Sequence, residues 1–302
     1  MTKDNRQRQD IYTRITDQIA SALEKGVKPW SQPWNAAHAA GPVSKPLRFS
    51  GEPYNGINIL SLWASAMELG YAAPIWMTYR QAKELGGQVR KGERGAPVVY
   101  ASTFSKTECD EQTGNEEEID IPFLKAYSVF NVDQIDGLPE RYYEQACTHD
   151  NTDERLAHAE QFFSSTRAKM LHGGNSAYYR MASDHIQMPS FGSFFNAQSY
   201  YATLAHESVH WTRHPDRLDR SFDRQRFGDE GYAKEELVAE LGAAFLCADL
   251  AIPLEDRNDH AAYIASWLKV LRDDKHAIFT ASAHAQRAVD YLHSLQDEAA
   301  PY

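Results

Sequence analysis

The segment Leu204-Ala-His-Glu-Ser-Val-His-Trp211 carries the pattern H-E-x-x-H in a stretch whose spacing predicts a helix over residues 200–213. Residues four apart lie about 40° apart around a helix axis, so His206 and His210 can hold one ion. Glu207 points about 100° away from His206, where it can reach a water at an open coordination position. Such a carboxylate takes a proton from the water and later donates it to the leaving group. The pattern therefore predicts a hydrolytic metal site, the alternative being an amphipathic helix that happens to carry two histidines.

A short strand is predicted just before this helix, at residues 183–188. The segment Asp184-His-Ile-Gln-Met-Pro189 would supply the strand edge that often holds an extended peptide beside such a site. The alternative is an ordinary strand inside a sheet.

A third ligand is expected downstream, because a catalytic zinc takes three protein ligands and keeps the fourth position for water. The predicted helix over residues 234–251 has an apolar face that is interrupted by Glu236 and Glu240, one turn apart. We expect Glu236 to be the ligand and Glu240 to orient a ligand histidine, since their E-x-x-A-E spacing resembles the thermolysin-like pattern. Two alternatives remain: both glutamates are solvated surface residues, or His214 is the ligand, although Pro215 argues against a helix that long.

The chain of 302 residues is long enough for two domains, which we place at residues 1–150 and 151–302. The polar segment Gln145–Glu154 is the expected linker between them. Hydrophobic residues make up 42% and charged residues 24%, which is typical of a globular protein. Helices are further predicted at residues 10–25, 57–69, 78–85, 154–170, 260–271 and 281–295, and strands at 96–100 and 121–130, the latter two forming a long hairpin. We therefore expect an α+β fold of two domains, with an α+β domain at the N-terminus.

Several classes of protein are disfavoured by the composition. No apolar run is long enough to span a bilayer and the first residues form no apolar signal, so we expect a cytoplasmic protein with no membrane partner. The three cysteines, Cys109, Cys147 and Cys247, are far apart and have no CxxC spacing. They predict free thiols rather than disulfides or a thiolate metal site.

Basic and aromatic residues concentrate near the N-terminus. The net charge is −11, yet residues 1–100 hold 13 Lys and Arg against 8 Asp and Glu. Bases of a single strand stack on aromatic rings while cations follow the phosphates, so this mixture predicts single-stranded DNA as a partner. The candidate contacts are Trp30, Trp34, Arg48, Tyr54, Asn55, Arg80, Arg90, Lys91 and Arg94. The alternatives are that the rings pack in the core and that residues 86–95 form only a turn with solvated charges.

Six motifs together resemble one family. They are Pro53-Tyr-Asn-Gly-Ile-Asn58, Trp76-Met-Thr-Tyr-Arg-Gln-Ala82, Leu85-Gly-Gly-Gln-Val-Arg-Lys-Gly-Glu93, Val129-Phe-Asn131, His206-Glu-Ser-Val-His-Trp-Thr-Arg-His214 and Glu235-Glu-Leu-Val-Ala-Glu-Leu-Gly242. The chain is similar over nearly its whole length to the ArdC family of plasmid antirestriction proteins. The resemblance implies an N-terminal domain that binds single-stranded DNA, similar also to one in TraC-type primases, followed by a zincin-like metallopeptidase domain.

The resemblance also implies a role, the protection of incoming conjugative DNA from host restriction. His206, His210 and a glutamate of the Glu235–Leu241 segment match the family's metal positions, and Glu207 stands in the catalytic place. We expect Zn²⁺ as cofactor, with Mn²⁺ or another divalent ion as alternatives, and an unknown protein or peptide as substrate. Two further readings stay open: a DNA-binding shield whose zinc is structural, and a metalloprotease with no DNA role.

Overall fold

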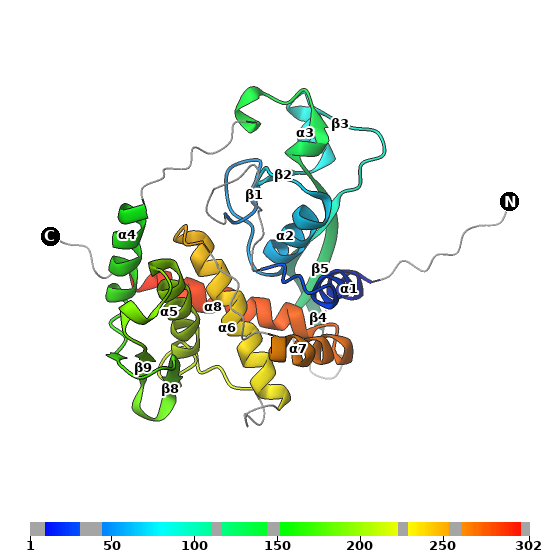
Figure 1. Cartoon of the computed structure of the whole chain (residues 1–302). Helices are drawn as coiled ribbons and strands as arrows, with labels where there is room; N and C mark the ends of the chain where they lie inside the picture. The colour runs from blue at the N-terminus through cyan, green and yellow to red at the C-terminus, as the bar shows by residue number, and fades with distance from the viewer. Residues whose placement is uncertain are drawn as a thin grey trace.

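The computed structural model describes residues 10–30, 44–109, 116–143, 152–222, 229–253 and 261–296. Helices and strands alternate along the first half and helices dominate the second, which confirms the α+β expectation (Figure 1). The helices are α1 Ile11–Glu24, α2 Ile57–Leu69, α3 Tyr79–Glu84, α4 Thr152–Ser165, α5 Ala197–Trp211, α6 Glu230–Asp249, α7 Ala261–Asp273 and α8 Ala277–Ser294. The strands are β1 Leu47–Arg48, β2 Ile75–Met77, β3 Gln88–Val89, β4 Ala96–Cys109, β5 Glu116–Asn131, β6 Ile135–Asp136, β7 Met170–His172, β8 Tyr178–Arg180 and β9 His185–Met188.

The N-terminal half is built on a four-stranded sheet in the order β1-β2-β5-β4. Its long hairpin pairs β4 with β5 from Ala96↔Val129 to Cys109↔Glu116, so both strands extend well beyond the predicted ones. A separate two-stranded sheet pairs β3 with β6. None of the helices in the described part of the chain combines the length and the apolar character that a bilayer crossing requires.

The outer edge of this sheet, strand β4, is covered by α2. The Asn58 side chain donates to the carbonyl oxygen of Val99 at 2.9 Å and accepts from its N–H at 2.8 Å. One turn later the Ser61 hydroxyl donates to the carbonyl oxygen of Pro97 at 2.7 Å. Unpaired strand edges promote aggregation, so these bonds both satisfy the backbone and cover the edge at Pro97 and Val99.

The C-terminal half has a three-stranded sheet in the order β7-β9-β8. The expectation that residues 184–189 form a strand edge is wrong, because β9 pairs in parallel with β7 on one side and antiparallel with β8 on the other. The helix predicted over 154–170 also ends early, at Ser165. Arg167 adopts a positive φ of 56°, a conformation that a helix does not contain, and β7 starts three residues later.

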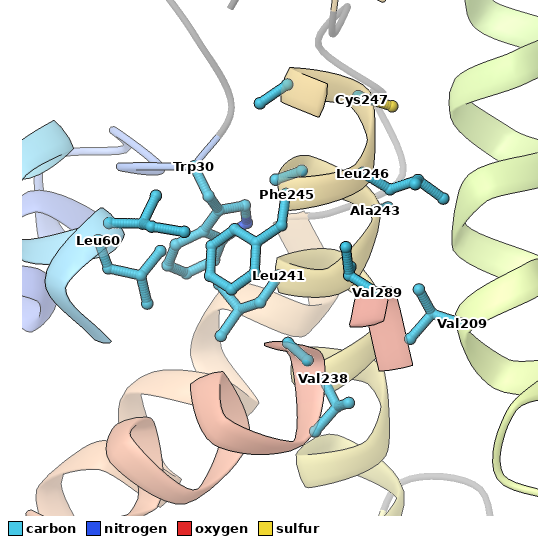
Figure 2. Close-up of a cluster of buried hydrophobic side chains, with 14 of the residues drawn as sticks. Trp30, Leu60, Val209, Val238, Leu241, Ala243, Phe245, Leu246, Cys247 and Val289 are labelled. Carbon is cyan, nitrogen blue, oxygen red and sulfur yellow. The ribbon is translucent and has the colours of Figure 1, made fainter. Parts of the chain in front are cut away.

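One hydrophobic core joins the two halves. Figure 2 shows Trp30 and Leu60 of the N-terminal half facing Leu241 and Phe245 of α6. The rings of Trp30 and Trp267 have their centroids 5.8 Å apart in an edge-to-face arrangement. Residues 145–151 of the predicted linker lie outside the described residues. The packing of α1 and α2 on the C-terminal helices therefore makes the fold one continuous body.

Helices α5 and α6 cross closely at Gly242. A β-carbon placed on Gly242 would lie 2.7 Å from Cγ2 and 2.9 Å from Cγ1 of Val209, which is closer than such atoms approach. Glycine costs about 1 kcal/mol against alanine in a helix, so its place here serves the close approach of the two helices. Val209 precedes His210, and the crossing thus sets the spacing of the candidate metal residues.

The variant Gly242→Ala is expected to lower the free energy of unfolding by about 1 kcal/mol, because overpacking costs about 1–3 kcal/mol and the helical preference of alanine returns about 1 kcal/mol. Urea unfolding would measure the change. Val209→Ala in the same chain removes the clashing methyl groups and should restore part of the loss. If the losses of unfolding free energy in Gly242→Ala and Val209→Ala simply add up in the double variant, the close crossing is contradicted.

Candidate metal centre

Helix α5 carries the H-E-x-x-H residues into the interior. The side chain of Asn196 caps the helix by accepting from the N–H of Ser199 at 2.8 Å. From Tyr200 to Trp211 every residue of α5 is buried, including His206, Glu207 and His210. The buried side chains of His206, Glu207 and His210 therefore require charged or hydrogen-bonding partners.

The two histidines face the same point. The Nε2 atoms of His206 and His210 lie 3.1 Å apart, and their rings are nearly perpendicular at 79°. Glu236 of α6 places Oε2 3.6 Å from Nε2 of His206 and Oε1 3.5 Å from Nε2 of His210. Ligand atoms about 2.0–2.2 Å from a tetrahedral zinc ion lie roughly 3.3 Å from one another. The three side chains, whose ligand atoms all lie within 4.8 Å of one another, could therefore hold one ion.

The electrostatics of this cluster also favour a cation. Burial alone would lower the pKa of His206, but the neighbouring carboxylates Glu236, Glu240 and Glu207 outweigh it and raise the pKa to about 10. Oε1 of Glu240 lies 3.4 Å from Nδ1 of His206, on the far side of the ring from Glu236. The cluster thus attracts positive charge at the point where the two Nε2 atoms meet, which is the requirement of a divalent ion.

His210 is held from behind by a pair that the sequence did not reveal. Its Nδ1 lies 3.0 Å from Oε1 of Glu235. Arg220 binds both oxygens of Glu235 at 2.9 Å and also donates to the carbonyl oxygen of Val209. Burial would raise the pKa of Glu235, but the hydrogen bonds from His210 and Arg220 and the charge of Arg220 lower it to about 2. The carboxylate is therefore ionised and fixes the orientation of the His210 ring.

His214 lies outside this cluster. Helix α5 ends at Trp211, with Thr212 as its C-terminal cap, so His214 falls in the following turn. Its Nδ1 accepts from the N–H of Asp216 at 3.2 Å. The turn is fastened by Arg217, which stacks 3.9 Å above the Trp211 ring and binds Asp184. Glu236 is therefore better placed than His214 to be the third ligand.

The candidate DNA contacts fall into two groups. The exposed group comprises Arg48, Asn55, Arg80, Arg90, Lys91 and Arg94. Within it, Arg48 pairs with Glu52, Arg80 with Glu84, and Arg90 with Glu93 and Asp136. Trp30 and Tyr54 are buried, at 2% and 4% exposure, and Trp34 lies outside the described residues. Trp30 packs on Trp267, and the Tyr54 ring lies under Arg48 at 5.4 Å. Neither buried ring presents a free face to a base in this structure.

An exposed tyrosine accompanies the exposed cations. Tyr79, which precedes Arg80, is 48% exposed and lies edge-on to Phe130. Its hydroxyl accepts from the Gln88 amide at 3.3 Å, two residues before the turn that carries Arg90 and Lys91. Gly92 in that turn has a φ of 94°, which a glycine adopts without strain. The structure thus shows a turn with solvated charges beside a half-exposed aromatic ring.

Two sequence families match the chain. Residues 9–130 match the N-terminal domain of the anti-restriction factor ArdC, and residues 157–284 match a zincin-like metallopeptidase family. The protein y4eC of Sinorhizobium fredii is 44% identical over 96% of this chain and 94% of its own length. A DNA primase TraC of Escherichia coli is 37% identical over 93% of this chain, which spans 27% of the primase.

Two solved structures of an ArdC protein are also similar to this chain. The metal-free crystal structure of the antirestriction ArdC protein from plasmid R388 is similar with a TM-score of 0.79 and 45% identity, over 97% of this chain and all of that one. Its Mn(II)-bound structure is similar with the same TM-score and 43% identity, over the same shares of both chains. The likeness covers both halves together and therefore includes the way in which they pack.

Proposed function

Because the chain belongs to the ArdC family of antirestriction proteins, we propose that it protects incoming plasmid DNA from restriction by joining a single-stranded-DNA surface to a metal-dependent hydrolase site. The observation that supports the hydrolase most directly is the convergence of His206, His210 and Glu236 within 4.8 Å, beside the buried Glu207. The Mn(II)-bound relative and the zincin-like family support the binding of a divalent ion.

We propose that His206, His210 and Glu236 hold the ion, with zinc as the resident metal. A divalent ion there would polarise a substrate carbonyl and lower the pKa of a water in the open position. Glu207, next to His206 on the buried helix, accepts the proton of the attacking water and returns it to the leaving nitrogen. Glu235 and Glu240 hold the two imidazoles in the ligand orientation from their Nδ1 sides. The substrate class that fits this chemistry is a protein or peptide.

The single-stranded-DNA surface is proposed around the exposed Arg80, Lys91 and Arg94, with Tyr79 as a stacking ring. Asn55 and Arg48 are accessible further contacts, and Arg90 can contribute to the field around the turn although acids engage it. Trp34 remains a candidate from sequence. The buried Tyr54 ring lies under Arg48, whereas the buried Trp30 packs on Trp267.

The triple variant Arg80→Ala, Lys91→Ala, Arg94→Ala tests this surface. Each lost phosphate contact should reduce the slope of log affinity against log salt by about 0.7, so the slope for a labelled single-stranded oligonucleotide should fall by about two units. Anisotropy titrations at several salt concentrations give the slope. The matched control, Lys169→Ala, Arg180→Ala, Lys269→Ala, removes the same number of exposed cations from the C-terminal half. Equal slopes for both variants would place the DNA elsewhere.

The whole function is tested by transferring an unmodified plasmid into a restricting recipient cell. The wild-type chain should raise the yield of transconjugants, and the triple variant of the N-terminal half should not. Protection that is independent of these cations would contradict the DNA part of the proposal. A second candidate, a DNA-binding shield with a structural ion, draws support from the buried Arg220–Glu235–His210 contacts that tie the site into the core.

A further inference from the structure

Glu236 has a neighbour that the proposed metal chemistry does not use. Tyr232 stands four residues before Glu236 on α6, so both side chains lie on the same face of the helix. Burial would raise the pKa of Glu236, but His206, His210 and, to a smaller extent, the Tyr232 hydroxyl one helical turn away lower it. A second phenol, Tyr263 of α7, has its hydroxyl 3.2 Å from that of Tyr232.

The second phenol is in turn fixed by the shared core. The Tyr263 ring stacks on Trp267 of the same helix, with centroids 5.9 Å apart and an angle of 21°. Trp267 is fully buried and meets the edge of Trp30, the last described residue before the segment 31–43. A continuous series of contacts therefore leads from the Tyr232 hydroxyl, one helical turn from Glu236, through Tyr263 and two indoles to the N-terminal half.

We propose that Tyr232, held by Tyr263, is a positioning residue that orients the Glu236 carboxylate toward His206 and His210. A carboxylate on a helix can rotate about its side-chain bonds, and a hydrogen bond to one oxygen removes that freedom before an ion arrives. Partners of this kind typically change metal affinity about 10- to 100-fold. The inference rests on the proposed metal site, and it adds that α7 and the packed Trp30 contribute to ion binding.

The chain offers a matched control for the loss of a hydroxyl. The hydroxyl of Tyr201 donates to Oε2 of Glu160 at 2.7 Å, so Tyr201→Phe also breaks a bond between a tyrosine and a glutamate. Both tyrosines belong to helices of the metal centre, α5 and α6, but Glu160 is not among the converging ligands. A general effect of losing such a bond would appear in both variants.

The experiment compares Mn²⁺ binding by the wild-type chain, Tyr232→Phe, Tyr263→Phe and Tyr201→Phe, with the unfolding free energy of each metal-free protein measured alongside. We expect Tyr232→Phe to bind Mn²⁺ about 10-fold more weakly, Tyr263→Phe to be weakened in the same direction by less, and Tyr201→Phe to match the wild type. The metal-free stabilities of Tyr232→Phe and Tyr201→Phe should both fall, because Tyr232→Phe loses its hydrogen bond with Tyr263 besides the proposed contact with Glu236, and Tyr201→Phe loses its hydrogen bond to Glu160.

Wild-type affinity in Tyr232→Phe would overturn the positioning role while leaving the proposed site intact. Equal weakening in Tyr201→Phe would overturn it as well, because the effect would then follow from general stability. A wild-type chain that binds neither Mn²⁺ nor Zn²⁺ would instead overturn the proposed site itself. Should Tyr232→Phe not fold, Tyr263→Phe decides, since the Tyr263 hydroxyl holds that of Tyr232 at 3.2 Å.

Discussion

Replacing Glu207 by glutamine is expected to reduce metal-dependent proteolysis by about 10²- to 10⁴-fold while the protein still binds its divalent ion. The amide has nearly the same shape as the carboxylate but cannot accept the proton of the attacking water. Cleavage of a labelled, denatured casein by the zinc-loaded protein gives the rate, and a metal titration of the same sample gives the occupancy.

Two further variants show whether the loss is chemical. Glu236→Ala removes a proposed ligand and should weaken ion binding by about 100-fold or more, because the loss of a ligand weakens binding more than the loss of a residue that only contacts a ligand. His214→Ala should bind the ion as the wild type does, because His214 lies outside the cluster. Weaker ion binding in His214→Ala than in Glu236→Ala would make His214 the ligand. If ion-loaded Glu207→Gln protects a transferred plasmid as well as the wild type, the shield function is correct and hydrolysis is not required.

Replacing Arg220 by methionine is expected to lower the free energy of unfolding by about 3–5 kcal/mol. Arg220 and Glu235 are both almost fully buried, and the substitution leaves the carboxylate without its bidentate partner. Urea unfolding at neutral pH gives the change. The double variant Arg220→Met/Glu235→Gln also lacks the charge of Glu235, so part of the lost stability should return.

An exposed ion pair provides the control. Arg272→Met breaks the contact with Glu24, where both side chains are about half exposed or more, and should cost no more than about 1 kcal/mol. A loss of that small size in Arg220→Met would contradict the structural importance of the buried pair. The comparison separates a buried charge that needs its partner from one that water can solvate.

The same pair predicts an acid limit to stability. The folded-state pKa of Glu235 is about 2, below its ordinary value of 4.5. A carboxyl whose pKa is depressed by folding contributes stability that is complete above pH 4.5 and is lost as the pH falls towards 2. In Glu235→Gln that contribution is absent, so its unfolding free energy should change less between these pH values.

The spacing of residues in the sequence accounts for the part of the candidate site that lies within single helices. The spacing of His206 and His210 follows from helix geometry alone, and α5 was expected almost at its true position. Glu236 and Glu240 were found for the same reason, since both interrupt the apolar face of one helix. His206 and His210 lie one helical turn apart, as do Glu236 and Glu240, which is a pattern that four-residue spacing can describe.

Contacts between distant segments were missed. Glu235 is adjacent to Glu236, but only the packing of α6 on α5 shows that it reaches His210. Arg220 comes from an irregular turn that has no periodicity to interpret. The burial of Trp30 and Tyr54 was equally hidden, because composition shows that rings are present but not which face of the fold covers them.

Because the two halves share one hydrophobic core, cutting the chain between them would expose apolar side chains. Trp30 and Trp63 of one half pack against Trp267 and Phe245 of the other. Severing the chain near residue 150 would leave these rings facing water on both fragments, which favours aggregation or collapse over independent function. The region matched in the TraC primase runs through both halves while occupying only 27% of that enzyme. The two halves thus recur together inside a much longer protein, as expected of segments that bury one set of rings between them.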